Sequence, residues 1–160
     1  MSLRIRFHKL SDARHRLELR RADGTEERRE LETRSLLRHD LMHYAVERAA
    51  GVASGFWGRL AGGASLTAVG ELDLWSMTDG PADDQELAVI ERLVGVLHDG
   101  GRGRPAAELV AALNQSAADA GTPLPTWVTE DLVARALTTY ATLIGRWRAT
   151  GFGSAMELVW

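Results

Sequence analysis

The chain has 160 residues, of which 45% are hydrophobic, with a formal net charge of −3 and no cysteine. A chain of this length buries one ordinary core, so we expect a single domain over residues 1–160. Without cysteine the protein has no disulfide framework, thiolate metal site or cysteine nucleophile, and a metal ion would need nitrogen and oxygen ligands.

We expect a cytoplasmic protein that does not enter membranes. Residues 1–10 alternate charged and apolar side chains and lack the apolar run of a signal peptide. No stretch reaches the roughly 20 apolar residues that span a bilayer. Basic residues outnumber acidic ones in the first 50 residues, but arginines alternate with glutamates there, as in residues 26–30. This alternation favours a salt-bridged surface and argues against nucleic-acid binding.

Period-two alternation predicts strands at both ends of the chain. Residues 3–9 and 14–20 alternate apolar and polar side chains, as in half-buried strands. Asp23-Gly24 then offers the positive-φ residues of a hairpin turn, before a polar strand over about residues 26–32. Residues 156–160 alternate again and predict a strand that returns to the amino-terminal sheet.

Helical periodicity dominates the rest of the chain. From Thr33 or Ser35, either able to cap it, a helix should continue to Ala50. The glycine-rich residues 51–70 around Phe56-Trp57 favour a short helix or turn whose backbone passes closely over a bulky group. The remaining expected elements are a short strand over 71–75 and helices over 81–97, 105–120 and 129–149. Together they predict an α+β fold, with an antiparallel sheet of about four strands packed against about four helices.

One stripe of the helix over residues 33–50 carries only imidazoles and carboxylates: His39, Asp40, His43 and Glu47. At about 100° per residue these side chains fall within about a quarter turn. Histidines at i and i+4 project one above the other, about 6 Å apart along the axis, so their ring nitrogens can converge on one ion. The stripe therefore predicts a divalent-metal site, for zinc or iron, with His39 and His43 as ligands.

The stretch His39-Asp40-x-x-His43 resembles the metal-binding helix of the zincin metallopeptidases, whose two histidines bind zinc and whose intervening acid is a general base. The resemblance implies the base role for Asp40, which stands where that family has glutamate, and a small-molecule or peptide substrate. Glu47 lies about 12 Å from His39 along the axis, so we expect it to accept a hydrogen bond from His43 and orient that ring. Asp40 and Glu47 are thus the candidate catalytic residues.

A broader resemblance covers most of the chain. The Asp23-Gly24 hairpin, the R-H-D-L-x-H-Y-A-V-E helix, the G-F-W-G turn and the closing apolar strand resemble a group of small uncharacterised bacterial proteins. The resemblance implies one compact domain and gives no information about a substrate.

Two questions stay open at this point. The third metal ligand has five candidates, namely His15, Glu71, Asp73, Glu91 and His98. The alternative function is a non-enzymatic interaction protein, a homodimer, in which the stripe is an internal hydrogen-bond network without metal. Trp160, at the end of an edge strand, is the candidate interface residue.

No G-x-S-x-G elbow or nucleotide-binding fingerprint is present, which argues against serine hydrolases and nucleotide cofactors.

Overall fold

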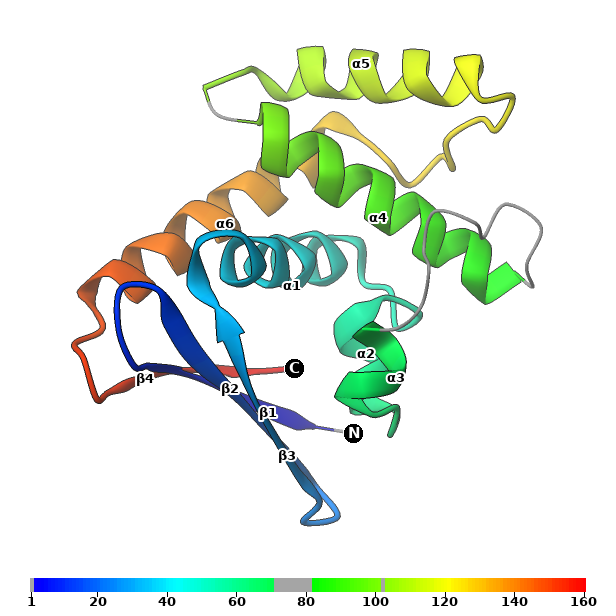
Figure 1. Cartoon of the computed structure of the whole chain (residues 1–160). Helices are drawn as coiled ribbons and strands as arrows, with labels where there is room; N and C mark the ends of the chain where they lie inside the picture. Colours follow the sequence, from blue (N-terminus) through cyan, green and yellow to red (C-terminus); the bar gives the residue numbers. More distant parts are fainter. Residues whose placement is uncertain (1, 71–81, 102) are drawn as a thin grey trace.

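The computed structural model describes residues 2–70, 82–101 and 103–160. Within these residues the chain forms an antiparallel sheet with helices stacked on one face (Figure 1). The sheet has the strand order β3-β2-β1-β4, from β1 (Leu3–Lys9), β2 (Arg14–Arg21), β3 (Glu26–Glu32) and β4 (Ala155–Val159). The helical elements are η1 (Thr33–Leu37), α1 (Arg38–Ala50), α2 (Phe56–Ala61), α3 (Leu66–Gly70), α4 (Ala82–Gly100), α5 (Ala106–Asp119) and α6 (Glu130–Ala149). The predicted α+β fold is confirmed.

The turn between β2 and β3 differs from the predicted one at one position. Gly24 has a positive φ of 88°, whereas no residue other than glycine has a positive φ in the described chain. The amide of Gly24 donates to the carbonyl of Arg21, and the amide of Arg21 donates to the carbonyl of Thr25. The loop is therefore a three-residue turn closed by glycine, and it needs one positive φ instead of the two expected for Asp23-Gly24.

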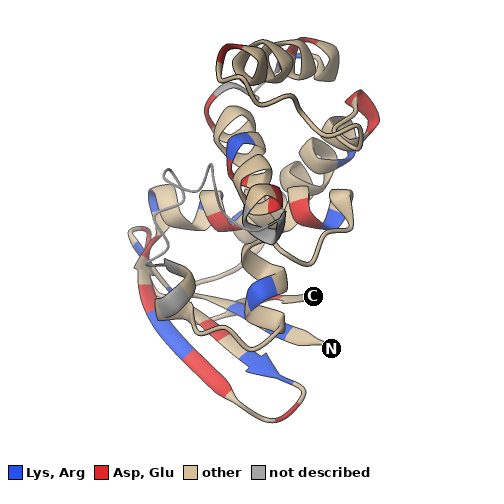
Figure 2. Ribbon diagram, turned by 90° about the vertical axis from the view of Figure 1, so that its right-hand side faces the viewer, with Lys and Arg blue, Asp and Glu red and all other residues tan. Residues whose placement is uncertain are grey.

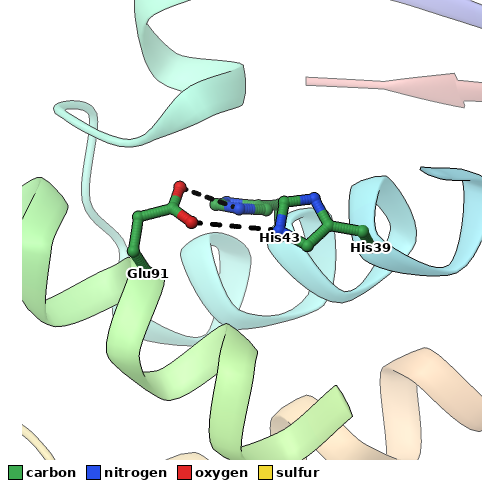
Figure 3. Close-up of side chains that lie close together, drawn as sticks. All are labelled: His39, His43 and Glu91. Carbon is green, nitrogen blue, oxygen red and sulfur yellow. Dashed lines mark ion pairs between the residues drawn. The ribbon is translucent and has the colours of Figure 1, made fainter. Parts of the chain in front are cut away.

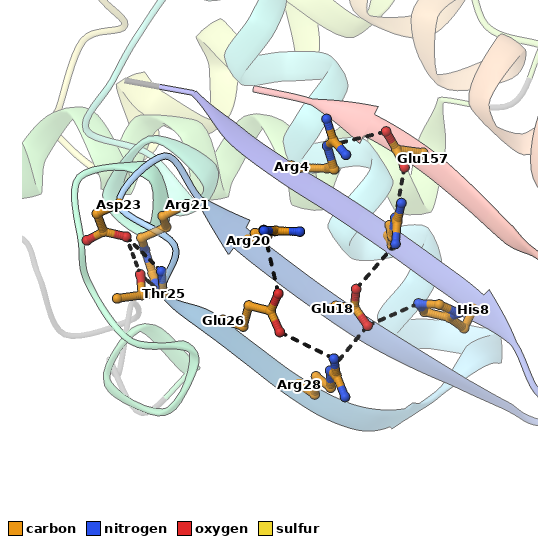
Figure 4. Close-up of polar contacts among 11 residues, drawn as sticks. Arg4, His8, Glu18, Arg20, Arg21, Asp23, Thr25, Glu26, Arg28 and Glu157 are labelled. Carbon is orange, nitrogen blue, oxygen red and sulfur yellow. Dashed lines mark hydrogen bonds and ion pairs between the residues drawn. The ribbon is translucent and has the colours of Figure 1, made fainter.

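The open face of the sheet carries a network of alternating charges (Figure 4). Glu18 on β2 lies 3.2 Å from Arg28 and 3.6 Å from Arg6, on the two neighbouring strands. Arg6 also reaches Glu157 on β4, at 2.8 Å. Basic and acidic positions follow one another along the strands in Figure 2, as the sequence of residues 26–30 predicted.

The helix that carries the polar stripe begins differently from the prediction. Neither Thr33 nor Ser35 caps it; instead, the side chain of Glu32 accepts hydrogen bonds from the amides of Arg34 and Ser35. A carboxylate serves here because it can satisfy two of the free amides of a first turn at once. The first turn, η1, is π-helical and runs directly into α1, which ends at Gly51 with a φ of 68°.

Helix α1 is the central element of the molecule. Leu37, Leu41 and Tyr44 belong to a core shared with the sheet, α2 and α6. Met42 and Val46 belong to a second core shared with α4, α5 and α6. Figure 1 shows the resulting layers, with α1 and α6 over the sheet and with α4 and α5 beyond them. Because apolar partners cover α1 from two sides, three residues of its polar stripe, Asp40, His43 and Glu47, are buried.

The other elements follow the expected order. The helix predicted over 81–97 continues to Gly100, and those predicted over 105–120 and 129–149 occur as α5 and α6, the latter capped by Thr129. The glycine-rich segment forms α2 and α3. The strand predicted over 71–75 lies outside the described residues.

The carboxyl-terminal strand closes the sheet as predicted. β4 pairs antiparallel with β1. The hydroxyl of Tyr44 donates to the carbonyl of Val159 at 2.9 Å, and the guanidinium of Arg146 donates to the carbonyl of Glu157 at 2.8 Å. Trp160 is partly buried against the ring of Tyr44. These contacts tie the strand to α1 and α6 and occupy two carbonyls of an edge strand.

Candidate metal centre

Three potential metal ligands converge between α1 and α4. His39 and His43 lie one turn apart on α1, and Glu91 lies on α4, which packs against it. One ligand atom of each lies within 4.8 Å of the other two. Figure 3 shows both rings directed at the Glu91 carboxylate, with Nε2 of His43 2.9 Å from Oε1 and Nε2 of His39 3.9 Å from Oε2. Glu91 is thus the third-ligand candidate that the fold brings to the two histidines.

His43 is sealed from solvent, with 1% of its side chain exposed. Its Nδ1 lies 3.0 Å from Oε1 of Glu47, so the predicted contact is present. Burial by itself lowers the pKa of His43, but the hydrogen bond to Glu47 and the nearby Glu91 carboxylate outweigh it and raise the pKa to about 9. The buried Nε2 lies 2.9 Å from Oε1 of Glu91, but the pair does not have the geometry of a well-formed hydrogen bond in the described chain.

Glu47 has a second role that the sequence did not reveal. Its fully buried Oε2 accepts hydrogen bonds from the amide of Trp57 at 3.0 Å and from that of Gly58 at 3.3 Å. These amides belong to the first turn of α2, whose capping residue, Gly55, has no side chain to satisfy them. A Cβ on Gly55 would collide with the Glu47 carboxylate. One carboxylate therefore caps α2 and fixes the ring of His43.

A glycine in α2 makes a second close approach that can be tested. A Cβ on Gly58 would overlap the backbone of Ala53, which has little freedom to move. We expect Gly58→Ala to lower the free energy of unfolding by about 1–3 kcal/mol, measured by urea denaturation. Gly62, just after the same helix, is the matched control: its nearest neighbours would lie at 3.4 Å and its φ is −75°. Gly62→Ala should leave stability unchanged or raise it slightly, and equal losses in both variants would contradict the packing argument.

His39 lies at the solvent side of the group, with 43% of its side chain exposed. Its Nδ1 is 3.8 Å from Oδ1 of Asp40, whereas its Nε2 is the atom on the side of Glu91. The Asp40 side chain is 10% exposed, and its backbone carbonyl accepts a hydrogen bond from the Trp57 indole at 3.0 Å. Asp40 thus lies beside the ring nitrogen that faces away from Glu91.

His15 lies outside the group. It is fully buried under the sheet, and its Nδ1 is 3.2 Å from the hydroxyl of Thr33. Its Nε2 has no hydrogen-bond partner in the described chain, and its ring packs near Phe7 and Trp147. Burial lowers the pKa of His15, although the carboxylates of Asp40 and Glu32 partly oppose this effect.

The three remaining candidates for the third ligand are His98, Glu71 and Asp73. The ring centre of His98, on α4, is 6.5 Å from that of His39, and its Nδ1 is 3.1 Å from Asp99. It is adjacent to the group but is not one of the three converging ligands. Glu71 and Asp73 lie outside the described residues.

The sequence held a partial signal for Glu91, although it could not select this residue from the five candidates. Glu91 directly follows Ile90, a member of the apolar stripe of the helix predicted over 81–97. A carboxylate at the border of a buried stripe needs a polar partner on the opposing helix, and the stripe of imidazoles on residues 39–47 supplies one.

Comparison of the chain with known protein families, with curated proteins and with solved structures gave no match. The resemblance to small bacterial proteins and to the zincin helix therefore stays a prediction. Each helix of the described residues is too short or too polar to cross a membrane.

Proposed function

We propose that the protein binds one divalent transition-metal ion, zinc or iron, through His39, His43 and Glu91. The observation that carries this proposal is the convergence of two imidazole nitrogens and a carboxylate oxygen within 4.8 Å. Two imidazoles and one carboxylate are a ligand set used by both zinc and non-haem iron centres. Because three protein ligands leave coordination positions free, a water molecule or a substrate can complete the shell.

The distances need only a small adjustment to accept an ion. Ligand atoms about 2.0–2.1 Å from a tetrahedral metal lie roughly 3.3 Å from one another. The contact between His43 and Glu91 is already 2.9 Å, and the one between His39 and Glu91 is 3.9 Å. His39 is the most exposed of the three and can rotate inward, while buried His43 provides the fixed point. An ion would also satisfy Nε2 of His43, which has no directional hydrogen bond.

The neighbouring carboxylates support the site by orienting its rings. Glu47 accepts a hydrogen bond from Nδ1 of His43, and Asp40 lies beside Nδ1 of His39. This is the usual place of a carboxylate behind a metal-bound histidine. We therefore propose that both carboxylates position the histidines. A metal-bound water on the solvent side of His39 would be the nucleophile of a hydrolase acting on a small molecule or peptide.

A second candidate function rests on the same residues. Protonated His43 lies between the carboxylates of Glu47 and Glu91, at 3.0 and 2.9 Å, and this arrangement balances charge without a metal. In that case the stripe is a structural network of a non-enzymatic interaction protein, in which a homodimer is one form.

Titration with zinc and with iron(II) distinguishes the two functions. Protein freed of metal with EDTA should bind about one ion, and saturation at 100 times the dissociation constant should stabilise the fold by about 2.7 kcal/mol. His39→Ala and Glu91→Gln should each weaken binding by at least about 100-fold, because each removes a direct ligand. Calorimetric titration and elemental analysis after dialysis measure the stoichiometry.

His98→Ala is the matched control, since it removes a neighbouring imidazole that is not among the converging ligands. It should bind metal as the unaltered protein does. Equal binding by all variants, or no binding by the unaltered protein at millimolar metal, would contradict the metal centre and favour the structural network.

A further inference from the structure

A hollow of about 420 Å³ lies beside the candidate metal centre, where α1, α4 and α6 meet. Its apolar wall includes Met42, Leu97 and Ile144. Arg38 at the start of α1, Arg148 at the end of α6 and His98 on α4 also line it. This volume is within the range of small-molecule sites, which combine apolar walls with a few polar groups.

The two arginines of this hollow differ from most arginines of the sheet. Within the part of the chain that the structure describes, neither Arg38 nor Arg148 has a carboxylate partner or a side-chain hydrogen bond. A second hollow, at one end of the strands β1 and β2, is lined by Arg4, Arg20 and Arg21, and each of these lies within 3.6 Å of a glutamate. Of these two hollows, the one between the helices is therefore the one whose arginines have no carboxylate partner among the described residues.

We propose that the hollow between α1, α4 and α6 binds a small amphipathic carboxylate. The guanidinium groups of Arg38 and Arg148 would pair with the carboxylate, and their planar forks suit both of its oxygens. The apolar body would contact Met42, Leu97 and Ile144. The site lies next to the metal centre, because His98 lines the hollow and its ring centre is 6.5 Å from that of His39. Binding of the carboxylate does not require the metal, so this site extends the proposed function and stands apart from it.

Octanoate is the probe for this site, titrated in the presence of EDTA and followed by calorimetry and by amide chemical shifts. Acetate supplies the charge without the apolar body, and 1-octanol supplies the body without the charge. We expect octanoate to bind at least about tenfold more tightly than either. Arg38→Gln and Arg148→Gln should each weaken octanoate binding by about tenfold, because each removes one charge-assisted pair.

Two further variants keep the interpretation specific. Ala141→Trp places a large ring in the hollow and should abolish octanoate binding while both arginines remain. Arg14→Gln removes an arginine from the distant sheet face and should leave binding unchanged. The proposal is overturned if octanoate does not bind, if octanol binds as tightly, or if the shifts lie around Arg4 and Arg20. Unchanged affinity in Arg38→Gln and Arg148→Gln would overturn it as well.

Discussion

Replacing Glu47 by alanine should lower the free energy of unfolding by about 3–5 kcal/mol, the usual cost of removing one partner of a buried ion pair. Glu47 is fully buried and lies 3.0 Å from Nδ1 of His43. Its loss would leave a buried imidazolium with one carboxylate instead of two. The amides of Trp57 and Gly58 would also lose their acceptor, so α2 should loosen.

Urea denaturation measures this loss. Glu47→Gln keeps an acceptor for the two amides and should cost less than Glu47→Ala. Gly55→Ala should imitate the loss, because its methyl group would displace the Glu47 carboxylate. Glu108→Ala, which breaks an exposed pair with Arg104, should cost at most about 1 kcal/mol. A similar cost for Glu47→Ala and Glu108→Ala would refute the role assigned to Glu47.

The sequence predicted what depends on local periodicity and turn chemistry. Alternation over residues 3–9 correctly predicted the strand β1, and Thr129 followed by two acidic residues correctly predicted the start of α6. The composition of one face of α1 was also informative. A stripe of imidazoles and carboxylates without lysine or arginine, on a helix with apolar residues on its other faces, is expected to make its polar contacts in the protein interior. The spacing of Glu47 along the same helix correctly predicted its contact with His43.

Features that depend on how elements pack were out of reach. From the sequence, Glu91 was one of five candidates for the third metal ligand, because the choice among them depends on the register of α4 against α1. Glu32 replaced Thr33 and Ser35 as the cap because the first turn is π-helical, which no sequence pattern signalled. Glu47 caps α2 through a contact between residues ten apart in the sequence. The glycines at 55 and 58 predicted a close approach of the backbone to another group, but they did not identify that group.

The stability of the metal-free protein should fall as the pH rises from about 6.5 to 9. The pKa of His43 is raised from its ordinary value of 6.5 to about 9, so the folded state holds a proton that the unfolded state releases. This contribution is complete below pH 6.5 and is lost as the pH passes through 9. A rise of this size corresponds to about 3 kcal/mol. Glu47 and Glu91, which face His43 from α1 and α4, are the source of the stabilisation.

His15 should have the opposite effect on the pH dependence of stability and produce a loss on the acid side. Burial lowers its pKa, so the unfolded state takes up the proton more readily and stability is lost as the pH falls below 6.5. The two histidines together predict a maximum of stability near pH 6.5, measured by urea denaturation in EDTA. His43→Gln should flatten the alkaline limb alone, and His15→Gln should flatten only the first part of the acid limb. Hydrogen bonds lower the pKa of the Asp23, Glu32 and Glu157 carboxyl groups, so these groups titrate below about pH 4.5. A fall in stability between pH 6.5 and 4.5 that survives in His15→Gln would therefore assign this loss to another group.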